Sequence, residues 1–136
     1  IDQLDGNSFE TFSALLFSKM GYIAQVTEKG QGDGGIDLIA INSGIGMLVQ
    51  CKSSQSASIG WDAIKEVVGG AMRYQSKMPS VKFKKVAITN QRFNATATGQ
   101  ADVNHVELID RSQIEKMLQQ FRITDFELDE FLIKNI

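Results

Sequence analysis

The 136-residue sequence has one cysteine, Cys51, and one histidine, His105. A single cysteine excludes a disulfide within the chain, which fits a reducing compartment and predicts a cytoplasmic protein. A single histidine, far along the chain, offers no Ser–His or Cys–His pair for nucleophilic catalysis, and we expect His105 to be an incidental surface or turn residue. The sequence contains no apolar run of membrane-spanning length and no signal-peptide pattern.

The overall composition is that of an ordinary globular domain, with 43% hydrophobic and 22% charged residues. No repeat or low-complexity tract divides the chain, and its length suits one domain. The sequence begins at Ile1 rather than at a methionine. We therefore expect a single domain over residues 1–136, excised from a larger protein, with a core at about 4–120 and a C-terminal helix at 124–135.

Acidic residues are missing from one long stretch of an otherwise acidic chain. The net charge is −2, yet residues 67–101 contain no acid and six basic residues, which are Arg73, Lys77, Lys82, Lys84, Lys85 and Arg92. Such a concentration of positive charge is a candidate surface for a polyanion. The alternative is a solvated basic face without a partner.

The first half of the sequence predicts a helix followed by three strands. Apolar residues recur at helical spacing over residues 7–20, with Asn7 as the N-cap and Glu10 completing a capping box. The three strands are separated by glycine-containing loops and cover residues 22–27, 36–41 and 47–52. The last two are joined by a short Asn/Ser/Gly turn and predict a hairpin.

The second half predicts helices that alternate with short strands. The helices cover residues 61–77, 95–103, 113–120 and 124–134, and the strands cover 84–89 and 106–110. Ser112 with Glu115, and Thr124 with Glu127, have the spacing of a capping box. The first of these helices should bury a stripe formed by Ile64, Val67, Val68, Ala71 and Met72. This order predicts an α/β fold of the α+β sandwich kind, with a mixed sheet of about five strands flanked by helices.

Polar side chains stand at the ends of two strands that are otherwise apolar. Gln50 and Lys52 are two residues apart and share one face of their strand, and the hairpin brings Asp37 close to them. A carboxylate, an amide oxygen and the Cys51 backbone carbonyl are hard oxygen ligands that suit Mg²⁺ or Mn²⁺. Lys52 adds a positive charge that can orient water or stabilise a phosphate. The set fits metal-assisted hydrolysis of a phosphodiester. The alternative is that Asp37 is a solvated acid beside a turn and that Gln50 and Lys52 lie on the exposed face of an edge strand.

Three stretches resemble the catalytic domain of the Mrr-type restriction endonucleases, within the PD-(D/E)xK nuclease superfamily: FETFSALLFSKMGYIAQVTEKGQGDGGIDLIA, LVQCK and VAITNQRFNATATGQADVNHVELIDRSQIEKML. The resemblance covers about residues 4–120 and implies a restriction-endonuclease-like fold. It implies that Asp37 matches the metal-binding aspartate and Lys52 the catalytic lysine. Gln50 matches a position that is acidic in much of the superfamily. Glu10 matches an acidic residue that completes the metal shell directly or through water, although it also suits the helix cap.

The same resemblance implies a Mg²⁺-dependent DNA endonuclease in which Mn²⁺ can substitute. A homodimer would cut both strands, and a separate domain would direct the enzyme to modified or foreign DNA. Two other interpretations stay open: a nuclease-fold module that binds DNA or protein without cutting, and a structure-specific, junction-resolving nuclease. The side chains that suit contacts to DNA phosphates are Gln31, Ser53, Ser54, Lys82, Lys84, Lys85 and Arg92.

Overall fold

The computed structural model describes residues 6–27, 35–54 and 58–134. Its helices are α1 (Gly6–Lys19), α2 (Asp62–Lys77), α3 (Ala95–Asn104), α4 (Arg111–Gln120) and α5 (Asp125–Lys134). Its strands are β1 (Ile23–Val26), β2 (Leu38–Asn42), β3 (Ile45–Lys52), β4 (Ser58–Ile59), β5 (Lys82–Thr89), β6 (Arg92–Phe93) and β7 (Val106–Ile109). Every helix and strand that the sequence predicts is present. The pattern does not predict β4 and β6, because two residues are too few to show a periodicity.

Five strands form one mixed sheet in the order β1–β2–β3–β5–β7. β1, β2 and β3 pair antiparallel, whereas β5 and β7 add parallel to β3. Parallel neighbours need a crossover, and α2 and α3 supply it. The predicted mixed sheet of about five strands is therefore confirmed. β4 and β6 form a separate two-stranded sheet just after β3 and β5 end.

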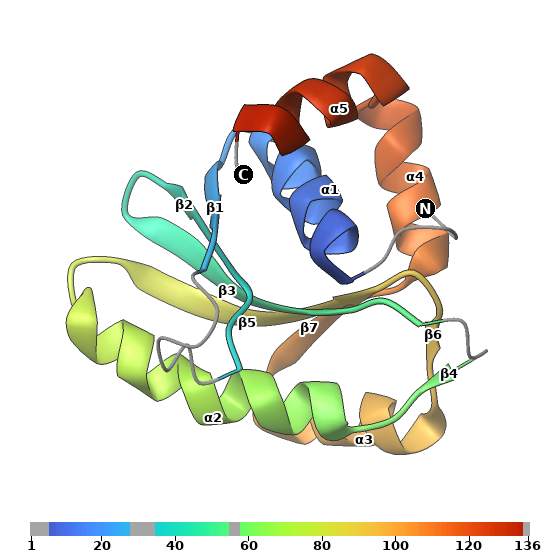
Figure 1. Ribbon diagram of the computed structural model, residues 1–136. Helices are drawn as coiled ribbons and strands as arrows, with labels where there is room; N and C mark the ends of the chain where they lie inside the picture. The colour runs from blue at the N-terminus through green and yellow to red at the C-terminus, as the bar shows by residue number, and fades with distance from the viewer. Residues whose placement is uncertain (1–5, 28–34, 55–57, 135–136) are drawn as a thin grey trace.

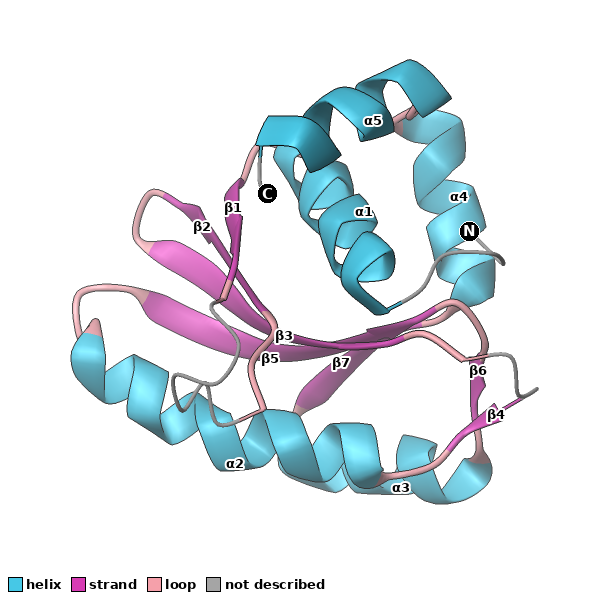
Figure 2. Ribbon diagram, viewed as in Figure 1, coloured by secondary structure: helices cyan, strands magenta, loops and turns pink. Residues whose placement is uncertain are grey.

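Helices cover both faces of the sheet, as Figure 1 and Figure 2 show. α1, α4 and α5 lie on one face, and α2 and α3 lie on the other. Each face has its own apolar core. The core on the α1 side includes Phe9, Phe17, Leu38, Val49 and Ile88, and the core on the α2 side includes Ile36, Leu48, Ile64, Val67 and Ala101. Polar groups at the carboxyl ends of β3 and β5 therefore lie at the edge of the sheet, where the two cores meet solvent.

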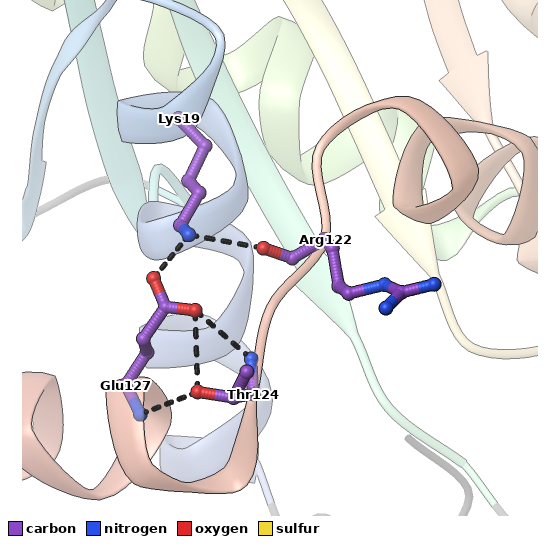
Figure 3. Close-up of polar contacts among 4 residues, drawn as sticks. All are labelled: Lys19, Arg122, Thr124 and Glu127. Atoms are coloured by element: carbon purple, nitrogen blue, oxygen red, sulfur yellow. Dashed lines mark hydrogen bonds and ion pairs between the residues drawn. The ribbon is translucent and has the colours of Figure 1, made fainter.

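A polar cluster fixes the C-terminal helix α5 to α1 (Figure 3). The N–H of Glu127 donates to Thr124 Oγ1 at 3.1 Å, and the Glu127 carboxylate accepts from the Thr124 N–H, which confirms this predicted capping box. Lys19 of α1 forms an ion pair with Glu127 and donates to the Arg122 carbonyl. The hydrogen bond from Lys19, and next the one from the Thr124 N–H, lower the pKa of Glu127 below its ordinary value.

The other two predicted N-caps are wrong. α4 begins two residues before Gln113, because Asp110 leaves β7 in an extended conformation and its Oδ1 accepts from the Gln113 N–H. Asp110 therefore caps α4 in place of Ser112, and Gln113 takes the role predicted for Glu115. Asn7 is the second residue of α1 rather than its N-cap, since the helix starts at Gly6.

The buried stripe of α2 differs in part from the prediction. It runs through Ala63, Ile64, Val67 and Gly70. Met72 is 79% exposed, because its side chain lies to one side of that stripe. His105 ends α3 in the left-handed conformation, at φ 58°, which confirms that it is a turn residue. Among the described residues, no helix combines the length and apolarity needed to cross a bilayer.

Candidate active site

The hairpin of β2 and β3 brings Asp37 against the end of β3. Its turn consists of Ser43 and Gly44, and its register pairs Leu38 with Val49. The Asp37 N–H donates to the Val49 carbonyl at 2.8 Å. The N–H of Cys51 donates to Asp37 Oδ2 at 2.9 Å. The carboxylate is buried, and it is held beside the backbone between Gln50 and Lys52, as the hairpin predicts.

The strand is irregular at Asp37. Strict alternation would put Ile36 and Leu38 on the same face of the sheet. Instead, Leu38 packs in the core on the α1 side and Ile36 in the core on the α2 side. Asp37 also bonds to Val49, the residue that pairs with Leu38, so two residues share one partner. This is the geometry of a β-bulge, which turns the Asp37 carboxylate toward the Cys51 N–H.

Glu66 of α2 joins the other two predicted site residues. The Gln50 Nε2 donates to Glu66 Oε2 at 2.7 Å, and the Lys52 Nζ donates to Glu66 Oε1 at 2.8 Å. Gln50 and Lys52 therefore share one face of β3, as predicted, and that face lies against α2. Sequence reasoning did not find Glu66. Its signal is helical spacing, because Glu66 lies three residues after the buried Ala63 and four before the buried Gly70.

A glycine lets the chain before Asp37 approach Glu66 closely. Gly35 has φ +87°, and a Cβ there would lie 2.4 Å from the backbone carbonyl oxygen of Glu66. Thr27 fixes the other side of the same segment, since its hydroxyl donates to the Ile36 carbonyl at 2.7 Å and its N–H to the Asp37 carbonyl at 2.9 Å. The segment that carries Asp37 is thus held between β1 and α2.

Polar groups at the end of β5 and directly after it fix the backbone around Lys52. Thr89 pairs with Lys52 in the register of β3 and β5, and its hydroxyl donates to the Lys52 carbonyl at 2.5 Å. The side chain of Asn90 accepts from the Ser54 N–H at 3.0 Å, and that of Gln91 donates to the Ser54 carbonyl at 2.7 Å. Thr89 and Asn90 are almost fully buried. The carboxyl ends of the two strands are therefore rigidly joined.

The oxygen atoms near the end of β3 suit a hard cation. They are the Asp37 carboxylate, the Cys51 carbonyl and Gln50 Oε1. Gln50 Oε1 is buried and accepts no hydrogen bond from the residues that the structure describes, so it is an acceptor that a cation would satisfy. The described part of the chain contains no group of three His, Cys, Asp or Glu side chains able to hold a metal ion. The acidic residue Glu10 is buried on α1, which covers the face opposite α2.

The predicted DNA-contacting residues fall in different places. Ser53, Ser54 and Arg92 lie at or just beyond the carboxyl ends of β3 and β5. Lys82, by contrast, pairs with Ile45, which lies seven residues before Lys52 along β3. At about 3.3 Å per residue, Ile45 and Lys52 are about 23 Å apart along the strand.

The other lysines of β5 also lie away from Lys52. The Lys84 Nζ pairs with Glu107 at 2.9 Å, and this hydrogen bond raises the pKa of Lys84. Lys85 is half-buried and pairs with Leu48, four residues back from Lys52. Gln31 lies outside the described residues. The structure thus gathers Ser53, Ser54 and Arg92 near the candidate site and separates Lys82, Lys84 and Lys85 from it.

The comparisons with known proteins agree with this arrangement. The model of the Mrr catalytic family, described as a restriction endonuclease, matches residues 1–118. No curated protein matches the sequence. Among solved structures, the MspJI restriction endonuclease in complex with a 27-mer oligonucleotide has a TM-score of 0.62 at 20% identity over 95% of this chain. This chain spans 31% of the MspJI chain.

Two further structures are similar. The small subunit of the heterodimeric restriction endonuclease R.BspD6I has a TM-score of 0.62 at 18% identity, over 94% of this chain and 78% of its own. A protein of unknown function, AF1548, has a TM-score of 0.64 at 20% identity, over 94% of this chain and 77% of its own. At these identities the likeness shows a shared fold, and the predicted restriction-endonuclease-like fold is confirmed.

Proposed function

The chain belongs to the Mrr-type catalytic family of restriction endonucleases, and from this premise we propose that it hydrolyses DNA phosphodiester bonds with the help of Mg²⁺. Mn²⁺ would substitute, because it accepts the same hard oxygen ligands. The ligands would be the Asp37 carboxylate, Gln50 Oε1 and the Cys51 carbonyl. A contribution from Glu10, directly or through water, stays a prediction.

One observation carries this proposal. Gln50 Oε1 is a buried acceptor left unpaired by all described residues, on a strand end where a carboxylate and a lysine are also fixed. A buried polar atom without a partner costs about 1–3 kcal/mol, so it calls for a ligand. Gln50 Oε1 would be satisfied as a ligand of a bound cation, and Asp37 would supply the carboxylate ligand. Bound there, Mg²⁺ supplies Lewis-acid polarisation of a phosphate oxygen and of water.

Lys52 would act on the phosphate. In hydrolysis, the oxygen of a water bonds to phosphorus, one P–O bond to a sugar oxygen breaks, and the water's proton ends on solvent or on the leaving oxygen. Negative charge grows on the phosphate oxygens during this change. The Lys52 ammonium has three N–H donors, of which Glu66 accepts one, so it can donate to a phosphate oxygen or to the attacking water.

Assembly and targeting follow from the same proposal. One site cuts one strand, so a break in both strands needs two copies, and we expect a homodimer on duplex DNA. Further domains of the parent protein would choose modified or foreign DNA as the target. The protein would work in the cytoplasm, where its substrate and a reduced Cys51 are both expected.

The proposal is tested by incubating supercoiled plasmid with wild type, Asp37→Ala and Lys52→Ala, with Mg²⁺ or Mn²⁺ and with a chelator. We expect nicked and linear plasmid only with wild type and metal. A wild type that retards plasmid on a gel but never cuts it would favour the binding module. Cutting by both variants would exclude the proposed site. Faster cutting of four-way junctions than of linear duplex would favour a junction-resolving nuclease.

A further inference from the structure

We propose that Glu66 is a positioning residue that fixes which atom of the Gln50 amide faces the metal site. The proposal rests on the function proposed above and adds to it a residue that lies on α2, outside the strands. Glu66 is not a ligand in this scheme. It acts through Gln50 and Lys52, whose side chains it holds with its two carboxylate oxygens.

The argument begins with the chemistry of an amide beside a carboxylate. A carboxylate oxygen only accepts hydrogen bonds, so the group that Gln50 presents to it must be the NH₂. The 2.7 Å bond from Nε2 to Glu66 Oε2 therefore turns Oε1 away from Glu66. Oε1 is left buried and accepts nothing from the described residues. Without Glu66 the amide could rotate by half a turn and present N–H groups to a cation, which would repel it.

The position of Glu66 is itself fixed. Its backbone carbonyl lies against Gly35, where no side chain fits, and its other oxygen accepts from the Lys52 Nζ at 2.8 Å. The positive charge of Lys52 offsets the negative charge of Glu66, so the pair adds no net charge to the site. A glutamate at position 50 would need no such orientation, because its two oxygens are equivalent. Gln50 and Glu66 are thus complementary.

Metal binding without DNA tests the proposal. Mn²⁺ is titrated into the protein and followed by electron paramagnetic resonance, for wild type, Glu66→Gln and the control Asp62→Asn. Both variants remove one negative charge from α2, but Asp62 is exposed and pairs only with Lys65 among the described residues. We expect Glu66→Gln to weaken Mn²⁺ binding about 10- to 100-fold, as loss of a group that orients a metal ligand does. Asp62→Asn should change it less than about 3-fold.

The same pair of variants in a Gln50→Glu background separates orientation from charge. There the ligand needs no orienting and its carboxylate would lie against that of Glu66, so Glu66→Gln should no longer weaken Mn²⁺ binding. An equal loss in both backgrounds would overturn the proposal, because Glu66 would then act as a ligand or through its charge alone. Thermal melts confirm that each variant is folded. Glu66 is partly exposed, so Glu66→Gln should fold normally.

The metal-binding experiment and the plasmid-cleavage experiment can fail independently of each other. A wild type that cuts plasmid but binds no Mn²⁺ would overturn the role of Glu66 and leave the nuclease in place. A wild type whose Mn²⁺ binding depends on Glu66 as expected, but which cuts no DNA, would support the positioning role and overturn the nuclease. Unchanged Mn²⁺ affinity in Glu66→Gln would overturn the positioning role directly.

Discussion

The two ends of the β3–β5 pair carry polar side chains of different kinds. At the carboxyl ends, Gln50, Thr89 and Asn90 are buried, and each forms a hydrogen bond to a neighbouring segment of the chain. At the amino end of β5, Lys82 and Lys84 are exposed to solvent. Lys84 there forms a surface ion pair with Glu107.

This difference bears on the two alternatives that the charge pattern left open. A buried polar group lowers stability by about 1–3 kcal/mol unless it is paired, whereas an exposed lysine keeps its water. The carboxyl end holds its polar groups in fixed positions, as a reaction site requires. The amino end has the features of a solvated basic face. The contrast supports a site at the carboxyl end and a solubility role for the lysines at the other.

The largest effect is expected from a comparison of two lysines, one at each end of the β3–β5 pair. Lys52→Met should lower the rate of plasmid cleavage by about 100-fold or more, because in the proposed function the Lys52 charge would lie beside the reacting phosphate. Lys82→Met, at the other end of the same strand pair, should change the rate by less than about 3-fold. The measurement is the initial rate of nicking at saturating Mg²⁺. Equal losses of nicking rate in the two variants would mean that DNA cleavage depends equally on both ends of the strand pair.

The next comparison concerns two glycines of the hairpin. Gly35→Ala should lower the free energy of unfolding by about 1–3 kcal/mol, because Gly35 has φ +87° and its Cβ would meet the Glu66 carbonyl. Gly44 lies in the turn at the amino end of β3, where no described atom lies within 4 Å of a Cβ. Gly44→Ala should change stability by less than about 0.5 kcal/mol. Urea unfolding measures both, and a neutral Gly35→Ala would mean that α2 moves aside easily.

Much of the fold follows from patterns that are local in sequence. The apolar spacing of α1 and the short turn at Ser43 and Gly44 each specify one element, and the hairpin turn specifies the register that brings Asp37 to β3. The helix-cap errors come from competition between neighbours. Asp110 and Ser112 both suit an N-cap, and only the end of β7 decides between them. The exposure of Met72 was not predicted, because the buried stripe runs through Gly70, which does not count as hydrophobic.

The site was less accessible to sequence reasoning, because part of it depends on packing between distant elements. Gln50 and Lys52 are found from strand alternation alone. Glu66 is one of several polar residues on α2, and its contact with β3 depends on how the helix lies on the sheet. The bulge at Asp37 likewise depends on Gly35 meeting α2. Sequence reasoning therefore brought together the strand residues of the candidate site and did not find the helix residue that contacts two of them.

A smaller effect is expected from one buried hydroxyl. Thr89→Val should lower the free energy of unfolding by about 1–3 kcal/mol, because it leaves the Lys52 carbonyl and the Gln91 N–H without their hydroxyl partner in the core. Thr98→Val is the matched control, since the Thr98 hydroxyl also donates to a backbone carbonyl but is exposed. It should change stability by less than about 0.5 kcal/mol. Similar losses in both would mean that burial adds nothing at Thr89.

The smallest effect is expected at the amino end, from the pair of Lys84 and Glu107. The hydrogen bond to Glu107 raises the pKa of Lys84 in the folded protein, so the pair's contribution is complete below the ordinary lysine value of about 10.4 and is lost as the pH rises through the folded value. Glu107→Gln should therefore cost about 0–1 kcal/mol at pH 7, and less in high salt. The difference in unfolding free energy between Glu107→Gln and wild type, measured by urea unfolding, should narrow as the pH rises above the ordinary lysine value of about 10.4. A loss larger than that of Thr89→Val would reverse the contrast between the two ends, because the exposed pair would then matter more than the buried hydroxyl.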